Sequence, residues 1–153
     1  HVMAGYWNNP EASIAALRGG WLHTGDLGRV DEEGYLYVVD RKKDMLISGG
    51  LNVYPAEIER VLAGMPGIIE VAVIGVPHEK WGEAPAVVVF TGGAEVKAED
   101  VLARCKAQLA DFKLPRYFHV SSTPLPRNMS GKILKRELKI ELAHLPQTSQ
   151  AIR

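Results

Sequence analysis

Two runs of apolar, β-branched residues limit the folds open to this chain more than any other feature. "IIEVAVIGVP" covers residues 68–77 and "APAVVVF" covers residues 84–90, and residues typical of turns bound both runs. Short apolar runs of this composition are typical of buried strands. We therefore expect a short central β-sheet that other elements cover.

Three further segments have the apolar spacing of helices that pack on such a sheet. In "YPAEIERVLAGMPG" (54–67), Pro55 suits the first turn of a helix and Gly64 suits its end. The other two helices are expected in "EDVLARCKAQLADF" (99–112) and "KILKRELKIEL" (132–142). The residues predicted for the three buried faces are Ile58, Val61 and Leu62; Val101, Leu102, Cys105, Leu109 and Phe112; and Leu134, Leu138 and Leu142.

Shorter patterns complete the predicted fold. Residues 27–30 and 35–39 read as a hairpin around the turn "DEEG", and "MLISGG" and "RYFHV" read as short strands. The order predicts an α+β fold: a small domain with a short central β-sheet flanked by helices, preceded by a β-hairpin. Residues 145–153 are expected to form a flexible tail.

Composition indicates an ordinary globular protein. The chain has 153 residues, of which 46% are hydrophobic, and its 18 Lys and Arg balance 18 Asp and Glu. That balance argues against a generic nucleic-acid binder, which usually has a basic surplus. The single cysteine, Cys105, excludes a disulfide framework and suits a cytoplasmic location. No apolar run approaches the ~20 residues of a transmembrane helix, and no signal peptide is expected. The start, "HVMAGYWNNPEAS", lacks an initiator methionine and suggests a fragment of a longer protein.

Four stretches carry residues suited to binding a nucleotide. In "HTGDLG", a carboxylate at Asp26 could accept hydrogen bonds from both hydroxyls of a ribose. In "DRKKD", the forked donors of Arg41 could contact the same ribose or a phosphate. Taken alone, each residue is more simply explained as part of a turn or of a solvated charged segment.

The other two stretches contain glycines. "SGGLNVYP" offers exposed backbone along which a thin ligand could pass, although an ordinary loop is equally consistent with it. "NMSGKIL" offers Lys132, a point charge on a flexible stem that suits a phosphate oxygen. It is not a phosphate-binding loop of the Walker A type, and "ISGGLNV" is not a dinucleotide-binding fingerprint, because the required residues are absent.

In their order and spacing, these stretches resemble the C-terminal part of an acyl-CoA synthetase of the adenylate-forming (AMP-binding) superfamily. The resemblance is carried by "GWLHTGDLGRVDEEGYLYVVDRKKDMLISGGLNVYPAEIE", "VAVIGVPHEKWGEAPAVVVF", "FKLPRYFHV" and "LPRNMSGKILKREL", from Gly20 to about Leu142. It implies that residues 1–40 are the end of a large N-terminal adenylation domain. Residues 41–144 would then be a mobile C-terminal lid.

The resemblance also implies an activity. Such ligases use ATP and Mg²⁺ to turn a carboxylic acid into an acyl-adenylate, and then transfer the acyl group to the thiol of coenzyme A. The phosphate loop, the acyl pocket and most of the Mg²⁺ site would belong to the missing large domain of the same chain. We therefore expect the fragment by itself to be inactive, and the parent to be an AMP-forming acid–thiol ligase, most similar to medium- or long-chain fatty-acid ligases.

Roles for individual residues follow from the same resemblance. Asp26 and Arg41 match the ribose-binding pair, and Lys43 with Asp44 match the hinge. Lys132 matches the catalytic lysine that reaches the substrate carboxylate and the α-phosphate during adenylation. The residues that match the coenzyme A and pantetheine channel are Gly49, Gly50, Trp81, Phe112 and Lys113. Some relatives carry a basic residue where Leu114 stands, so the grip on the nucleotide end is expected to be weaker or shared with Arg116.

Several alternatives stay open at this stage. The acid could be an aryl acid, the acceptor could be a carrier-protein thiol, or the relative could be a luciferase-like oxygenase. A non-catalytic interaction module is the alternative of another class. Residues 1–18 are expected to be disordered or to rely on a neighbour, and self-association is a risk because of their apolar side chains. These are Val2, Tyr6, Trp7, Ile14 and Leu17.

Overall fold

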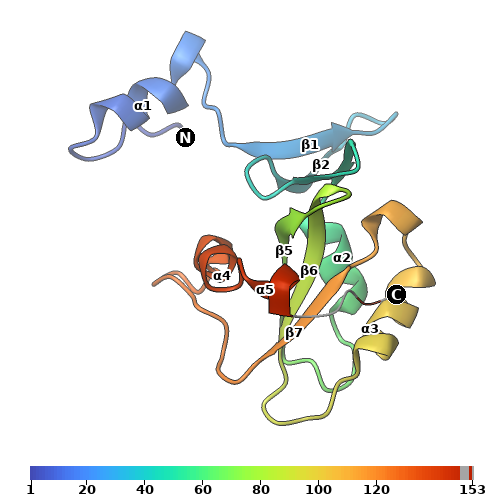
Figure 1. Ribbon diagram of the computed structural model, residues 1–153. Coiled ribbons are helices and arrows are strands. Elements are labelled where there is room, and N and C mark those ends of the chain that lie inside the picture. The colour runs from blue at the N-terminus through green and yellow to red at the C-terminus, as the bar shows by residue number, and fades with distance from the viewer. Residues whose placement is uncertain (149–151, 153) are drawn as a thin grey trace. The chain divides into compact units, whose positions relative to one another are not determined.

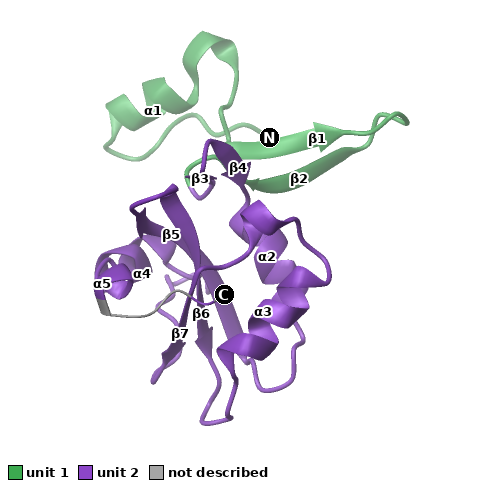
Figure 2. Cartoon of the chain, turned by 45° about the vertical axis from the view of Figure 1, so that its right-hand side comes forward, with its two compact units in different colours: residues 1–43 green, residues 44–153 purple. Residues whose placement is uncertain are grey.

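The computed structural model describes residues 1–148 and 152, and the chain forms two compact units. The smaller unit is residues 1–43 and the larger is residues 44–153 (Figure 2). The predicted domain boundary lies between residues 40 and 41, and the two units divide after Lys43. Each unit has its own secondary structure and is described separately.

The smaller unit consists of a short helix and a hairpin. Helix α1 (Pro10–Ala16) begins at Asn9, whose Oδ1 accepts the amide of Ala12 at 3.1 Å. A 3₁₀ turn, η1 (Arg18–Gly20), follows it. Strands β1 (Asp26–Val30) and β2 (Leu36–Arg41) then pair antiparallel, with an irregularity between Leu27 and Gly28. The hairpin agrees with the sequence prediction.

Residues 1–18 were expected to be disordered or to rely on a neighbour, and helix α1 forms within them. The helix buries none of its residues. Val2, Tyr6, Trp7 and Ile14 are exposed, and Leu17 is partly buried. These residues thus remain an apolar surface of the smaller unit.

The larger unit is built on a five-stranded sheet. The strand order is β4-β3-β6-β5, and β7 pairs with β6 (Figure 1). Strands β5 (Glu70–His78) and β6 (Gly82–Phe90) are antiparallel over nine residues, whereas β7 (Tyr117–Ser121) runs parallel to β6. Strands β3 (Leu46–Ser48) and β4 (Leu51–Val53) form a short hairpin, and Ser48 pairs with Gly82 of β6.

Helices cover both faces of this sheet (Figure 2). Helices α2 (Pro55–Leu62) and α3 (Ala98–Lys106) pack on the face that contains Val73 and Val87. Helices α4 (Lys135–Glu141) and α5 (Leu145–Thr148) pack on the face that contains Ile74 and Val88. Neighbouring residues of β5 and β6 therefore enter opposite cores, which explains why both sequence runs are apolar throughout. The α+β fold is confirmed.

The structure differs from the sequence prediction in four places. Strand β4 was not expected. Phe112 does not continue the face of α3, because the chain turns into a separate 3₁₀ helix, η2 (Asp111–Lys113), where Phe112 is 37% exposed. Helix α4 begins at Lys135 and not at Lys132, because Arg127 and Ile133 form an isolated β-bridge before it. Leu145 is only 3% exposed, so α5 is packed rather than a free tail.

The rest of the expected tail, at residues 149–151 and 153, lies outside the described residues. Within the described part of the chain, no helix combines the length and apolar character needed to cross a membrane.

Helix α4 offers a matched test of this packing. Leu138 is 3% exposed in the core, whereas Ile140 on the same helix is 70% exposed. Leu138→Ala should reduce the free energy of unfolding by about 2–4 kcal/mol, because it leaves a cavity between α4 and the sheet. Ile140→Ala should change it by less than about 0.5 kcal/mol. Urea unfolding followed by circular dichroism measures both values, and equal losses would contradict the packing described.

Candidate functional site

Asp26 and Arg41 face each other across the hairpin of the smaller unit. The register pairs their Cα positions, and Arg41 Nε lies 3.3 Å from Asp26 Oδ1. Both side chains are partly exposed, so the ion pair adds little to stability. A carboxylate has about four acceptor positions, so Asp26 retains the capacity to accept further hydroxyl donors. The structure therefore brings together two of the residues predicted to bind a ribose.

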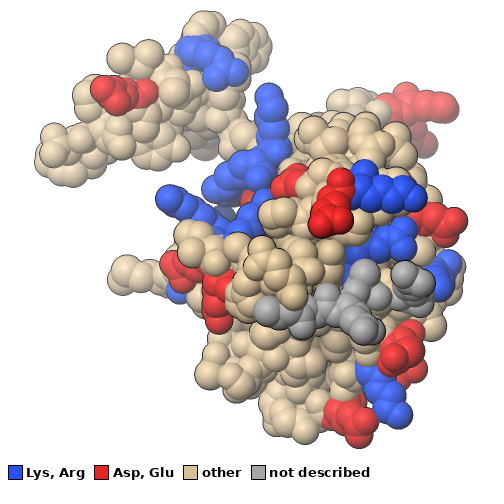
Figure 3. All heavy atoms as spheres, in the orientation of Figure 1, with Lys and Arg blue, Asp and Glu red and all other residues tan. Residues whose placement is uncertain are grey.

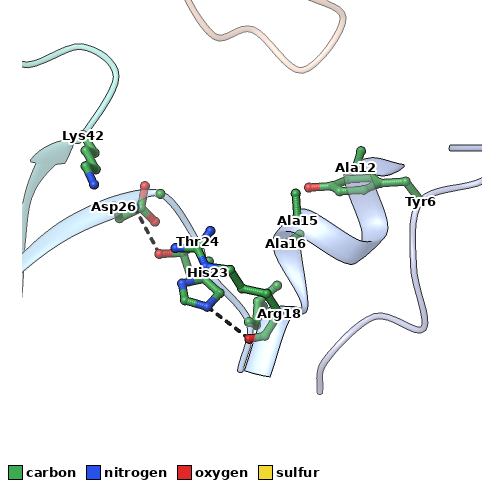
Figure 4. Close-up of a pocket in the computed structure, with 11 residues that line it drawn as sticks. Tyr6, Ala12, Ala15, Ala16, Arg18, His23, Thr24, Asp26 and Lys42 are labelled. Carbon is green, nitrogen blue, oxygen red and sulfur yellow. Dashed lines mark hydrogen bonds between the residues drawn. The ribbon is translucent and has the colours of Figure 1, made fainter. Parts of the chain in front are cut away.

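A pocket of about 770 Å³ opens beside Asp26 (Figure 4). His23, Thr24 and Asp26 line it from the segment that leads into β1, and α1 contributes Ala12, Ala15 and Ala16. The amide of Asp26 donates to Thr24 Oγ1 at 3.1 Å, and His23 Nε2 lies 3.2 Å from the Arg18 carbonyl oxygen. These contacts fix the backbone next to the Asp26 carboxylate.

Lys42 also lines this pocket, and the sequence analysis did not single it out. Its amide donates to the Gly25 carbonyl at 2.8 Å, which ties the end of the hairpin to the residue before Asp26. Lys42 and Arg18 place cations around a carboxylate, so the pocket can hold an anion as well as a hydroxyl group. The adjacency of Lys42 to Arg41 in "DRKKD" was the only signal in the sequence.

Lys132 lies in a closed loop of the larger unit. Asn128 donates its amide to the Lys132 carbonyl at 3.0 Å, and the Lys132 amide returns a bond to Asn128 Oδ1 at 2.9 Å. Gly131 supplies the positive φ of +80° that the turn requires. The backbone of Lys132 is thus held on both sides, whereas its side chain is exposed.

Arg127 and Lys135, which precede and follow Lys132 in this segment, are both paired with carboxylates. Arg127 Nη2 lies 2.7 Å from Glu70 Oε1, and Lys135 Nζ lies 2.7 Å from Glu59 Oε1. Among residues 1–148 and 152, no ion pair is found for Lys132. Lys132 is therefore an ammonium group that can approach an anion without first leaving a carboxylate.

A second pocket, of about 200 Å³, lies in the larger unit. Its lining is Ser48, Gly49, Leu51, Trp81, Asp111, Phe112 and Arg116. Four of these seven belong to the predicted coenzyme A channel: Gly49, Trp81, Phe112 and Arg116. The other three, Ser48, Leu51 and Asp111, were not predicted from the sequence. The lining combines aromatic surface with one guanidinium group, which suits a ligand that has both an apolar part and a phosphate.

The structure does not bring every predicted channel residue into this pocket. Gly50 does not line it, and Lys113 Nζ instead contacts Glu57 Oε1 at 2.7 Å while lying 5.6 Å from the Phe112 ring centre. Leu114 is buried in the core. A basic residue at that position could not reach the pocket without leaving the core, so Arg116 is the guanidinium that this pocket offers.

Gly49 packs directly against Trp81. Its amide donates to the Trp81 carbonyl at 2.9 Å, and a Cβ atom at Gly49 would lie 2.7 Å from Trp81 Cε3. Trp81 is further contacted by Lys80, whose Nζ lies 4.7 Å from the ring centre. The close approach of backbone and ring shapes one wall of the pocket and requires glycine at this position.

Neither a reactive thiol nor a metal-binding cluster is found among the described residues. Burial raises the pKa of the Cys105 thiol to about 11, so little thiolate forms near neutral pH. Across the described residues, no cluster of three or more His, Cys, Asp and Glu side chains is placed to hold a metal ion. Figure 3 shows that acidic and basic side chains are both spread over the face drawn.

Comparison with known proteins identifies the larger unit. Residues 57–132 match the family described as the AMP-binding enzyme C-terminal domain. The larger unit carries the C-terminal domain of AMP-binding enzymes. It is 53% identical over 134 residues to the long-chain-fatty-acid–CoA ligase FadD13 of Mycobacterium tuberculosis, covering 88% of this chain and 26% of that protein. It is 49% identical over 140 residues to a feruloyl-CoA synthase of an Amycolatopsis species, covering 91% and 28%.

Solved structures of AMP-binding enzymes share this fold. The o-succinylbenzoate CoA synthetase of Bacillus subtilis, in complex with its acyl-adenylate intermediate, is 45% identical with a TM-score of 0.83. That comparison covers 90% of this chain and 28% of the synthetase. The same synthetase has been solved in complex with ATP and a magnesium ion. The chain thus spans about a quarter of the length of the relatives it matches.

Gly49 and Gly50 give a matched test of the second pocket. Both have positive φ, +59° and +83°, so alanine at either position should cost about 1–2 kcal/mol of backbone strain. Only at Gly49 would the new methyl group collide with Trp81, because nothing lies within 4 Å at Gly50. Gly49→Ala should therefore cost a further 1–3 kcal/mol, roughly, and change the near-ultraviolet circular dichroism of Trp81. Equal losses of unfolding free energy would contradict this contact.

Proposed function

We propose that this chain acts as the C-terminal part of an AMP-forming acid–thiol ligase, together with a large N-terminal domain of the kind its relatives contain. The carrying observation is the closed loop that presents Lys132 without a carboxylate partner. In the proposed reaction, a substrate carboxylate oxygen attacks the α-phosphorus of ATP and pyrophosphate leaves. The thiol of coenzyme A then attacks the acyl carbon, and AMP leaves.

Lys132 serves the first step. Negative charge develops on the α-phosphate oxygens as the new bond forms, and an ammonium group already in place stabilises that charge without reorganisation. Lys132 is suited to this role because its backbone is held by Asn128 while its Nζ stays in solvent. In the same proposal, Asp26 and Arg41 bind the ribose of ATP, and Mg²⁺ is bound mainly by the large domain.

The second pocket serves the transfer step. Aromatic rings at Trp81 and Phe112 suit contact with the adenine or the pantetheine arm of coenzyme A, and Arg116 suits one of its phosphates. Gly49, which packs against the ring of Trp81, forms one wall of this pocket. Lys113 contributes through the Phe112 ring rather than through a free charge, because its Nζ is paired with Glu57.

The acyl substrate is proposed to be a medium- or long-chain fatty acid. The 53% identity to a long-chain ligase supports this choice, and the 49% identity to a feruloyl-CoA synthase makes an aryl acid the alternative. Since the proposed acyl pocket belongs to the large domain, the 153-residue chain by itself is proposed to form no acyl-CoA. A cytoplasmic location is proposed, where ATP and coenzyme A are available.

Lys132→Ala in the full-length ligase tests the proposal. Adenylation should slow by ~10²–10³-fold, the usual loss when one preorganised electrostatic donor is removed. Thioester formation from a supplied acyl-adenylate should stay near the wild-type rate, since Lys132 is proposed to act in the adenylation step only. Pyrophosphate release and thioester appearance measure the two steps separately. Arg136→Ala removes an exposed cation from the same segment and should slow neither step; unchanged adenylation in Lys132→Ala would refute the role.

Two half-reactions that share one lid require a joint, and we place it at Lys43 and Asp44. The division of the chain into two units between these residues supports that position. Both residues lie in a turn, so a rotation there would not break the hydrogen bonds of a helix or strand.

Lys43→Pro tests this joint. Proline fixes φ near −65° and removes one of the two torsions a rotation would use. Adenylation should persist while transfer to coenzyme A falls by orders of magnitude, because the variant is held in the adenylation pose. The same two assays apply, and Lys43→Ala, which removes the same side chain but keeps both backbone torsions free, is the control. If Lys43→Pro carried out both steps at near wild-type rates, the hinge could not lie at Lys43.

A further inference from the structure

Arg127 connects the Lys132 loop to the sheet. Its Nε and Nη2 donate to Glu70 Oε1 at 3.2 and 2.7 Å, and its Nη1 donates to the Gly131 carbonyl at 2.5 Å. One guanidinium group therefore bridges the first residue of β5 and the residue directly before Lys132. The planar fork of arginine is what permits both contacts at once, since an ammonium group has no second, rigidly spaced set of donors.

Glu70 anchors this bridge on a fixed element. It begins β5, its side chain is only 15% exposed, and its second oxygen accepts the Leu125 amide at 2.7 Å. The carboxylate thus holds the chain at both Leu125 and Arg127, just before the loop. Burial alone would raise the pKa of Glu70, but the Leu125 N–H and the Arg127 guanidinium hold that pKa below its usual value. The anchor is therefore ionised at neutral pH.

Asn128 closes the loop from within. Its Oδ1 accepts the amides of Ser130 and Lys132, at 3.1 and 2.9 Å, and the hydroxyl of Ser130 at 2.8 Å. The Gly131 amide adds a bond to the Asn128 carbonyl at 2.9 Å. Glu70, Arg127 and Asn128 form a chain of contacts, here called the loop clamp, that runs from β5 to the backbone of Lys132.

We infer that the loop clamp is a positioning device for Lys132: Glu70 and Arg127 fix where the lysine backbone stands, so that its ammonium group meets the α-phosphate of ATP in one place. The inference rests on the proposed role of Lys132. The physical reason is that a lysine side chain is long and flexible, so its precision must come from its backbone. A displacement of about 1 Å in a catalytic group can cost on the order of 10²-fold in rate.

Glu59 of helix α2, which also contacts β5, offers a control of similar chemistry. Glu59 also accepts one backbone amide, that of Val73 at 2.7 Å, and one cation, Lys135 Nζ at 2.7 Å. Its side chain is similarly shielded, at 22% exposed. This pair holds helix α4, which begins after the loop has closed through the bridge between Arg127 and Ile133. Glu59→Gln therefore loosens the unit by comparable chemistry without releasing the Lys132 loop.

The clamp itself is tested on this chain by amide hydrogen exchange. Arg127→Ala should speed exchange of the Gly131 and Lys132 amides and leave that of Val73 unchanged. Glu59→Gln, which removes the charge from the acceptor of the Val73 amide, should speed exchange of Val73 and leave Gly131 and Lys132 unchanged. Unchanged exchange at Gly131 and Lys132 in Arg127→Ala would overturn the clamp, and faster exchange at all three sites would show general loosening and overturn it too.

The functional half is tested in the full-length ligase by a double-mutant cycle. Arg127→Ala should lower the adenylation rate by about 10²-fold, and Arg127→Lys by less, while thioester formation from supplied acyl-adenylate stays near wild type. Glu59→Gln should spare both steps. In a Lys132→Ala background, Arg127→Ala should cause little further loss, because a residue that acts through Lys132 has nothing left to position.

Three outcomes separate the inference from the proposed function. If Lys132→Ala leaves adenylation intact, the proposed function fails. If Lys132→Ala slows adenylation but Arg127→Ala does not, only the positioning inference fails. If the two losses multiply in the double variant, or Glu59→Gln slows adenylation as much as Arg127→Ala, Arg127 acts independently of Lys132 or through stability alone, and the inference is overturned.

Discussion

The pairing of β5 with β6 is the constraint on which the larger unit depends. The two strands are matched over nine residues and are buried on both faces, so each must be covered from two sides. Helices α2 and α3 supply one cover and α4 and α5 the other. Since β5 ends the strand order, its outer edge needs partners too, and the Glu59 carboxylate accepts the amide of Val73 there. Glu70, the first residue of β5, accepts the amide of Leu125. Those same carboxylates hold Lys135 and Arg127.

Glu59 therefore has two contacts, one with the edge of β5 and one with Lys135, and Glu70 pairs with Arg127 in the same segment. An exposed strand edge must be paired, covered or charged if it is not to bind another chain. Here Glu59, which accepts an amide of β5, and Glu70, which begins β5, also pair with two of the three cations of "PRNMSGKILK". Arg127 and Lys135 are drawn to the sheet, and Lys132 between them is left exposed. Of these three cations, Lys132 is the one whose ammonium group is exposed and has no ion pair among the described residues.

Much of this fold could be predicted from local sequence, because burial leaves a pattern in it. Helices α2 and α3 show the apolar spacing of a helix with one buried face, and β5 and β6 show continuous apolar runs because both of their faces are buried. Strand β4 was missed because three residues cannot display an alternation. Phe112 was misplaced because the chain leaves the helix at a 3₁₀ turn whose position depends on packing against other elements. The partner of Arg127 could not be predicted either, since Glu70 lies 57 residues away in the sequence and no local pattern connects the two residues. Asp26 and Arg41 were each singled out, but their contact follows from a hairpin register that an irregularity shifts.

The buried Cys105 has a practical consequence. It is the only cysteine of this chain, and its thiol is both enclosed and held in the protonated form. A cysteine introduced on the surface, for example at the exposed Met129 of the Lys132 loop, would therefore be the one thiol in these 153 residues to react readily with a maleimide dye. A fluorescent dye can therefore be attached at one chosen site without first replacing Cys105, and movements of the Lys132 loop can be followed as changes in its emission.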